Sequence, residues 1–256
     1  MTSEGNIKIK SPKDIKLMAE GGKILARVKN ALEEKVDAGV SAYEIEELAS
    51  LLIKKEGAEE SFKKVPGYHW ATCVNVNEGI VHGIPKKDVV FKKGDVVSID
   101  CGVFYKGFHT DTSITKGIDV DDKLMDFIDT GKSALNRAVK KAVPGGRIYD
   151  ISEAIESTLL NKKLTPIRAL VGHGVGRELH EAPAIYCFTH GKRTDSPEIK
   201  EGMVLAIEVM YSFGNGEVGI EEDQWTISTS DGTISGLFED TVAVTKNGPL
   251  ILTDSY

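Results

Sequence analysis

Two segments of the chain have the same form, KGDVVSID at residues 93–100 and EGMVLAIE at residues 201–208. Each contains a glycine, continues as an apolar strand and ends in a carboxylate, which is Asp100 in the first segment and Glu208 in the second. A repeat of this kind indicates two related halves in one structure. It makes the two acids candidates for equivalent positions in those halves.

The segments upstream of these strands also correspond. Ser11-Pro12 starts an amphipathic helix, and a capping box at residues 41–44 starts a second one. In the second half, an apolar helical stripe over residues 124–139 ends before the turn Pro144-Gly145-Gly146, and another stripe follows over residues 151–159. This order predicts an α+β fold with a pseudo-two-fold axis, on which a site would receive one carboxylate from each half.

The length and composition fit one compact domain. Of 256 residues, 41% are apolar and 28% are charged, as in soluble globular proteins, and no Pro- or Gly-rich linker divides the sequence. We therefore expect a flexible N-terminal segment at residues 1–10 and a single domain at residues 11–256.

Charge and patterning argue against several partners. The net charge is 32 − 39 = −7 without a basic cluster, which disfavours nucleic acid. The apolar runs are much shorter than the about 20 residues of a membrane helix, and the N-terminus does not resemble a secretory signal. The cysteines, Cys73, Cys101 and Cys187, are far apart and predict reduced, buried thiols rather than disulfides or a zinc site. These features predict a cytoplasmic protein that binds neither nucleic acid nor a membrane.

The first candidates for chemistry are two acids, Asp100 and Asp111, in β-like segments joined by a turn at Tyr105-Lys106-Gly107. Hairpin pairing would bring them close together, where two carboxylates repel unless one is protonated or both bind a cation. Taken alone, such a pair is more often one turn residue and one solvated strand residue.

Three further residues strengthen the case for a cation site. Glu208 ends an apolar strand, Glu239 shares a strand face with Thr241, and a histidine lies in the glycine-rich segment GHGVGRELHEAP at residues 172–183. Each of them taken singly is more often a solvated or packed side chain. Together, four carboxylates and one neutral imidazole carry a charge of about −4, which two divalent metal ions would balance. These ligands suit Mn, Fe(II), Co or Zn, and a water between two such ions can become a hydroxide nucleophile.

A set of motifs carries a family resemblance: NEGIVHGIP at 77–85, the Asp100/Asp111 pair, GHGVG at 172–176 with HEAP at 180–183, Ile207-Glu208 and Phe238-Glu239. With these motifs the chain resembles, from Ser11 to about Leu250, a type I methionine aminopeptidase, of the peptidase family with the pita-bread fold. The resemblance implies two pseudo-symmetric halves that share a curved antiparallel sheet covered by helices.

The resemblance also implies a role for each candidate ligand. Asp100 would bind one of two divalent metal ions, His173 and Glu208 would bind the other, and Asp111 and Glu239 would bridge both. A hydroxide bridging the metals would attack the peptide carbonyl. Glu208 would receive the proton of the water and pass it to the leaving amine.

Residues that meet the substrate are implied in the same way. His82 and His180 would contact the scissile amide and stabilise the tetrahedral intermediate. Tyr68, Cys73 and Trp225 would form a sulfur-tolerant apolar pocket for the methionine side chain.

The predicted activity is metal-dependent removal of the N-terminal methionine from nascent proteins and peptides whose second residue is small. The resemblance implies a monomer, and it leaves association with ribosomes open. Leu179, Val209 and Asp240 depart from the residues that the family usually has. Because none of the three is a ligand, they bear on side-chain selectivity more than on the class of reaction.

Other interpretations remain open. A prolidase or Xaa-Pro aminopeptidase shares the fold but usually carries a large N-terminal domain, whereas here the catalytic unit is expected to begin at Ser11. A catalytically inactive pita-bread protein would act as a binding module, although such proteins typically lose ligands and all five positions are filled here. A two-metal esterase or phosphatase is disfavoured because no arginine fork lies next to the acids in the sequence.

Overall fold

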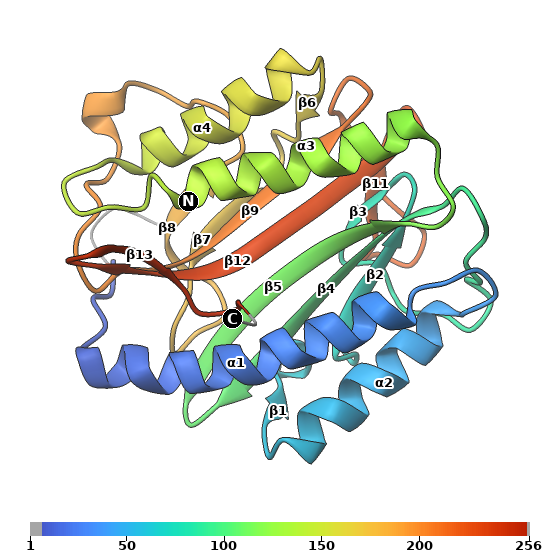
Figure 1. The fold of residues 1–256 in the computed structure, drawn as a ribbon, viewed down its shortest axis with the longest axis horizontal. Coiled ribbons are helices and arrows are strands. Elements are labelled where there is room, and N and C mark those ends of the chain that lie inside the picture. Colours follow the sequence, from blue (N-terminus) through green and yellow to red (C-terminus); the bar gives the residue numbers. More distant parts are fainter. Residues whose placement is uncertain (1–6, 255–256) are drawn as a thin grey trace.

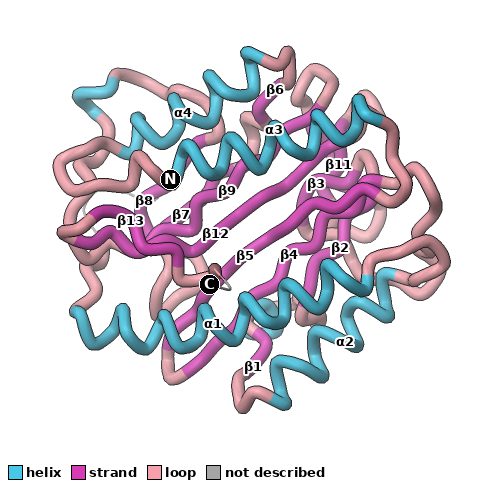
Figure 2. Tube along the Cα trace, viewed as in Figure 1, coloured by secondary structure: helices cyan, strands magenta, loops and turns pink. Residues whose placement is uncertain are grey.

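The computed structural model describes residues 7–254, in which four helices lie on one side of a β-sheet (Figure 1). The helices are α1 (Pro12–Lys35), α2 (Ala42–Lys55), α3 (Asp122–Val139) and α4 (Ile148–Asn161), with short 3-10 turns at Phe62–Lys64 and Arg193–Asp195. Figure 2 shows the strands as a separate layer crossed by these helices. Within residues 7–254, none of the helices is long and apolar enough to cross a membrane.

The main sheet has ten strands, and its pairings are antiparallel. Its order is β1 (Glu59–Glu60), β4 (Val96–Tyr105), β5 (Phe108–Gly117), β12 (Ser235–Thr245), β9 (Val204–Ser212), β7 (Val171–Gly174) and β8 (Glu181–Tyr186). Three more strands pair with members of this row, namely β2 (Thr72–Val76) with β4, β6 (Thr165–Pro166) with β9 and β13 (Gly248–Ile251) with β12. A second, three-stranded sheet has the order β10 (Val218–Ile220), β11 (Ile227–Thr229) and β3 (Gly79–Val81).

Local hydrogen bonds fix the helix starts that were predicted from the sequence. The Ser11 hydroxyl accepts from the Asp14 backbone N–H, and the Asp14 carboxylate accepts from the Ser11 N–H. Ser41 and Glu44 form the same reciprocal box at the start of α2. Each box satisfies two backbone donors that a helix end leaves free, which confirms both predicted starts.

Each pair of helices covers its own half of the sheet with apolar side chains. Leu25 of α1 belongs to the same buried cluster as Ile99 of β4, and Phe127 of α3 belongs to the same cluster as Ile207 of β9. Burial of one such side chain contributes about 1.5 to 3 kcal/mol. The apolar stripes of the helices therefore hold one face of the sheet away from water.

The two halves meet in the middle of the sheet. Strands β4 and β5 form a hairpin in the first half, strands β9 and β12 pair in the second, and β5 pairs with β12 between them. Helix α1 packs on β4 and β5 and α2 on β1 and β2, whereas α3 packs on β9 and β12 and α4 on β6 and β8 (Figure 1). The repeated order of helix pair and strands confirms the predicted α+β architecture.

Residues 1–6 of the predicted flexible segment lie outside the described residues, and among residues 7–10 Lys10 is buried. The Lys10 N–H donates to the Gly202 carbonyl, and its ammonium lies 2.7 Å from Glu181 Oε2. The side chains of Lys10 and Glu181 are only 6% and 2% exposed. This buried ion pair links the N-terminal segment to Glu181, which directly follows His180.

We expect Lys10→Met to lower the free energy of unfolding by about 3 kcal/mol, because it leaves the buried charge of Glu181 without its nearest cation. Urea unfolding at pH 7 measures this change. Lys8→Met is the matched control, since Lys8 is 44% exposed and lies 3.6 Å from the same carboxylate. The control is expected to cost less than about 1 kcal/mol. If both variants lowered the free energy of unfolding equally, the buried Lys10–Glu181 pair would contribute no more to stability than the exposed Lys8–Glu181 pair.

Candidate metal centre

Five adjacent strands of the main sheet each carry one of the predicted metal ligands. The strands are β4, β5, β12, β9 and β7, and in that order they carry Asp100, Asp111, Glu239, Glu208 and His173. The strand order of the sheet differs from the order along the chain. Residues that are far apart in the sequence are therefore brought into one row.

The pairing register places these side chains on the same face. Glu239 lies opposite both Glu208 and Ser113, and Ser113 lies opposite Asp100. Directly opposed residues project to the same side of a sheet, as do residues two positions apart, so Asp111 joins this face. His173 lies opposite Ala206, two residues before Glu208, and joins it as well. This face is the one that the helices do not cover.

A tight turn brings the two aspartates together, as the hairpin interpretation predicted. Strand β4 ends at Tyr105 and β5 begins at Phe108, and both turn residues have left-handed backbones, with φ of 48° at Lys106 and 87° at Gly107. Such a two-residue turn fits the twist of the two strands. Asp111 consequently pairs with Gly102, two residues beyond Asp100.

Burial and orphaned oxygens make this row a fit for cations. Ligand atoms of Asp111, His173 and Glu239, all buried, lie within 4.8 Å of one another. Within the part of the chain that the structure describes, Asp100 Oδ1 and Glu239 Oε1 are buried without a hydrogen-bond partner. Unsatisfied buried carboxylate oxygens are costly unless a proton or a cation meets them.

The electrostatics of the protein alone point the same way. Burial raises the pKa of Asp100 to about 7. Burial and then the neighbouring carboxylates raise the pKa values of Asp111, Glu208 and Glu239 far above their usual range. Four buried acids therefore resist ionisation together, and divalent cations with hard oxygen ligands would remove that penalty.

His173 is prepared as a nitrogen ligand. Its Nδ1 lies 2.9 Å from the Gly174 carbonyl oxygen, to which it donates, so Nε2 keeps its lone pair. Burial lowers the pKa of His173 to about 3, which keeps the ring neutral. Nε2 lies 3.9 Å from Glu208 Oε1. A Cβ on Gly172 would lie 2.7 Å from the Ala206 carbonyl oxygen and 3.1 Å from Glu208 Cγ, so only glycine lets β7 approach this closely.

A cavity of about 140 Å³ opens over the row of acids. It is lined by all ten of the predicted site residues: Tyr68, Cys73, His82, Asp100, Asp111, His173, His180, Glu208, Trp225 and Glu239. Four apolar residues complete the lining: Phe62, Val65, Val81 and Leu179. The candidate metal ligands and the candidate substrate residues thus share one cavity.

One wall of the cavity is aromatic and apolar. The rings of Tyr68 and Trp225 meet edge to face with centroids 5.1 Å apart, and the Tyr68 hydroxyl lies 3.1 Å from Cys73 Sγ. Phe62 and Leu179 are buried in the same cluster. Burial raises the pKa of both Tyr68 and Cys73, so the wall remains neutral near pH 7. An uncharged, polarisable side chain suits such a wall.

Two histidines, His82 and His180, also line the cavity. The ring centroid of His180 lies 4.5 Å from that of His173, and His82 sits on a left-handed backbone with φ of 59°. Burial lowers the pKa of both His82 and His180, and the proximity of His180 lowers that of His82 further. Each ring is therefore neutral near pH 7 and can donate one N–H to a carbonyl in the cavity.

Sequence reasoning missed several residues of the site. Phe62 and Val65 come from a 3-10 turn that has no motif, and Leu179 was singled out only as a family departure. Ser113 lies between Asp100 and Glu239, and its buried hydroxyl has no partner among residues 7–254. Only the alternation of side chains along β5, counted from Asp111, could have placed Ser113 on this face.

Comparison with known proteins gives consistent matches over most of the chain. The model of metallopeptidase family M24 matches residues 16–246. A methionine aminopeptidase of Clostridium perfringens is 38% identical over 246 residues, which are 96% of this chain and 98% of that protein.

Solved structures give the same picture. The crystal structure of a methionine aminopeptidase from Thermotoga maritima superposes with a TM-score of 0.94 at 39% identity, covering 97% of this chain and all of that one. A prolidase from Pyrococcus furiosus superposes with a TM-score of 0.74 at 24% identity, and the match covers 66% of its chain. The second match shows a common fold only, and the two together confirm the predicted pita-bread architecture.

Proposed function

The chain belongs to metallopeptidase family M24, among the methionine aminopeptidases, and on that premise we propose that it hydrolyses the N-terminal methionine from peptides and nascent proteins. The observation that carries the proposal is the row of four carboxylates and one imidazole beside a neutral apolar wall in a single cavity. A metallopeptidase needs the first feature for its cations, and an enzyme selective for methionine needs the second for the side chain.

The enzyme uses divalent metal ions, and we propose that it binds two. Asp100 would hold one ion, His173 and Glu208 the other, and Asp111 and Glu239 both. The unpartnered oxygens of Asp100 and Glu239 support this assignment. The ions, of which Mn, Co, Fe(II) and Zn suit the donor set, lower the pKa of water and so supply a nucleophile at neutral pH.

The residues of the chain then position the peptide. Tyr68, Cys73 and Trp225 would hold the methionine side chain against their neutral surface. The N–H groups of His82 and His180 would donate to the scissile carbonyl oxygen and stabilise the negative charge that develops there. The Glu208 carboxylate would take a proton from the attacking water and deliver it to the nitrogen of the leaving amine.

The proposal extends to the cellular setting. We infer a monomer with one catalytic domain over residues 11–256, in which β12 joins the two halves. Its substrates would be peptide N-termini with a small second residue, and it would meet them in the cytoplasm, where nascent chains arise.

Release of free methionine from Met-Ala-Ser tests the proposal, with cleavage of an Xaa-Pro peptide measured in parallel. The protein is first stripped of metal and then given Mn, Co, Fe(II) or Zn one at a time. Metal-dependent cleavage of Met-Ala-Ser alone is the expected result. Cleavage of the Xaa-Pro peptide alone would assign the chain to the prolidases, and metal binding without cleavage of either peptide would indicate a binding module.

We expect His82→Ala to lower kcat by about a hundredfold or more while leaving the metal content unchanged, because it removes one donor to the developing oxyanion. Steady-state kinetics on Met-Ala-Ser and elemental analysis of the purified variant measure the two quantities. His190→Ala is the control, since His190 is exposed and lies outside the cavity lining. Loss of metal from His82→Ala would contradict the assigned role.

A further inference from the structure

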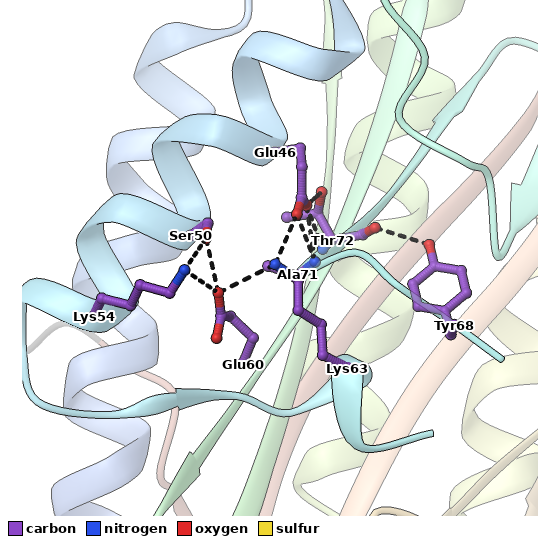
Figure 3. A network of polar contacts seen from close by, with 8 residues as sticks. All are labelled: Glu46, Ser50, Lys54, Glu60, Lys63, Tyr68, Ala71 and Thr72. Atoms are coloured by element: carbon purple, nitrogen blue, oxygen red, sulfur yellow. Dashed lines mark hydrogen bonds and ion pairs between the residues drawn. The ribbon is translucent and has the colours of Figure 1, made fainter. Parts of the chain in front are cut away.

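Helix α2 directs a buried carboxylate, Glu46, at the segment that leads into the cavity wall (Figure 3). Both oxygens of Glu46 lie 2.9 Å from the Ala71 backbone nitrogen. Oε2 also accepts from the Thr72 N–H at 3.0 Å and from the Thr72 hydroxyl at 2.9 Å. One side chain thus holds two successive backbone N–H groups and a hydroxyl.

The placement of Glu46 carries a cost that its partners must offset. A glutamate on a helix is ordinarily solvated, whereas Glu46 is 6% exposed, and burial raises its pKa. Its single cation, Lys63, lies 3.5 Å from Oε1, beyond a direct hydrogen bond of good geometry. The backbone of Ala71 and Thr72 is therefore the main partner of this carboxylate.

The segment held by Glu46 leads directly into Cys73, which belongs to the apolar wall of the cavity together with Tyr68 and Trp225. The Tyr68 hydroxyl lies 2.8 Å from the Thr72 carbonyl oxygen and 3.1 Å from Cys73 Sγ. Cys73 itself lies opposite Asp100 across strands β2 and β4. Any rotation of the peptide between Thr72 and Cys73 would therefore move both wall residues relative to the metal ligands.

We propose that Glu46 is a positioning residue that sets the side-chain selectivity of the cavity. This proposal rests on the proposed function above. The Glu46 carboxylate fixes the orientation of the Ala71 and Thr72 peptides. The Thr72 carbonyl then accepts from the Tyr68 hydroxyl and so fixes the position of the Tyr68 ring. Cys73 directly follows Thr72, so the orientation of the Thr72 peptide also fixes the position of Cys73. Side-chain specificity depends on wall positions held to within a fraction of an ångström.

Glu60 offers a matched control within the same polar network. Its Oε1 accepts from the Ser50 hydroxyl at 2.7 Å and lies 3.2 Å from the ammonium groups of Lys54 and Lys63. Glu60 therefore shares the cation Lys63 with Glu46, but its partners lie on α2 and the 3-10 turn (Figure 3). Glu60→Ala removes a network carboxylate without releasing the Ala71–Thr72 peptides.

The experiment compares kcat and KM of the metal-loaded enzyme on Met-Ala-Ser and Leu-Ala-Ser. We expect Glu46→Ala to lower the Met-to-Leu ratio of kcat/KM by about tenfold, mainly through a higher KM for the methionine peptide, with metal content unchanged. Glu46→Gln keeps an acceptor oxygen for the Thr72 donors and should restore the ratio to within about threefold of wild type. Glu60→Ala should leave the ratio at the wild-type value even where it lowers Tm.

Thr72→Val provides a second test, which remains available if the Glu46→Ala variant does not fold. It removes the hydroxyl donor to Glu46 and keeps the backbone, so the ratio should fall in the same direction by about threefold. An unchanged ratio in both Glu46→Ala and Thr72→Val, or an equal change in Glu60→Ala, would overturn the proposal. A wild-type enzyme that releases no methionine would instead refute the proposed function.

Discussion

Glu239→Gln is expected to lower kcat on Met-Ala-Ser at least about a thousandfold and to weaken the binding of divalent metal. Glu239 lies on β12, where it faces Glu208 on one neighbouring strand and Ser113 on the other. Its Oε1 is buried and has no hydrogen-bond partner among residues 7–254, which favours a cation beside it. An amide supplies neither the negative charge nor a second anionic oxygen, and Asp111→Asn should fail for the same reason.

Asp240 provides the control for this prediction, because it is the adjacent carboxylate on the same strand but projects to the opposite face. There it lies 3.2 Å from the Lys29 ammonium of α1 and accepts from the Thr253 hydroxyl. Asp240→Asn should retain activity and metal content close to those of the wild type. Steady-state kinetics and elemental analysis test both variants, and normal activity in Glu239→Gln would refute the metal-ligand assignment.

Removal of the metal is expected to abolish turnover and to make stability depend on pH. Burial raises the pKa of Asp100 to about 7, and those of Asp111, Glu208 and Glu239 rise as well. In the unfolded chain these acids titrate near pH 4. Between about pH 4 and the raised pKa values of the folded state, the folded metal-free protein therefore binds more protons than the unfolded one. Its stability should therefore be greatest at low pH within this window and fall as pH rises through 7.

Between pH 6 and pH 8 the metal-free protein should lose at least about 1.4 kcal/mol of stability, which is the contribution of Asp100 alone, whereas the metal-loaded protein should change little, because bound cations would balance the ionised acids. Urea unfolding at both pH values, with and without metal, gives the comparison. A metal-free protein that is more stable at pH 8 than at pH 6 would show that these acids are not held in a shared, poorly solvated site.

Local patterns in the sequence were sufficient to predict most of the helices and the division of the fold into two halves. The capping boxes at Ser11 and Ser41 join residues three apart, so their hydrogen bonds can be read without knowledge of the rest of the chain. The repeated segments that contain Asp100 and Glu208 predicted two related halves. The expectation that the strands end at these acids is wrong, because β4 continues to Tyr105 and β9 to Ser212. All ten candidate residues line one cavity, and Tyr68, Cys73 and Trp225 were expected there only from the family resemblance.

The contacts that the sequence did not predict join segments without a shared pattern. Lys10 and Glu181, which form a buried ion pair, are 171 positions apart. Glu46 lies in a stretch that reads only as an amphipathic helix, and its role is visible only from the distance to Ala71. Such partners are chosen by the tertiary packing, for which neither propensity nor hydrophobic period carries information.

The central place of β12 sets an order of assembly during translation. This strand joins β5 to β9 and follows both of them along the chain, so it is translated after both. Before it emerges, β5 and β9 each present an open edge of backbone donors and acceptors, which is the kind of surface that pairs with other chains. Glu239 lies on the same strand, so the proposed row of metal ligands is completed when β12 pairs with both edges.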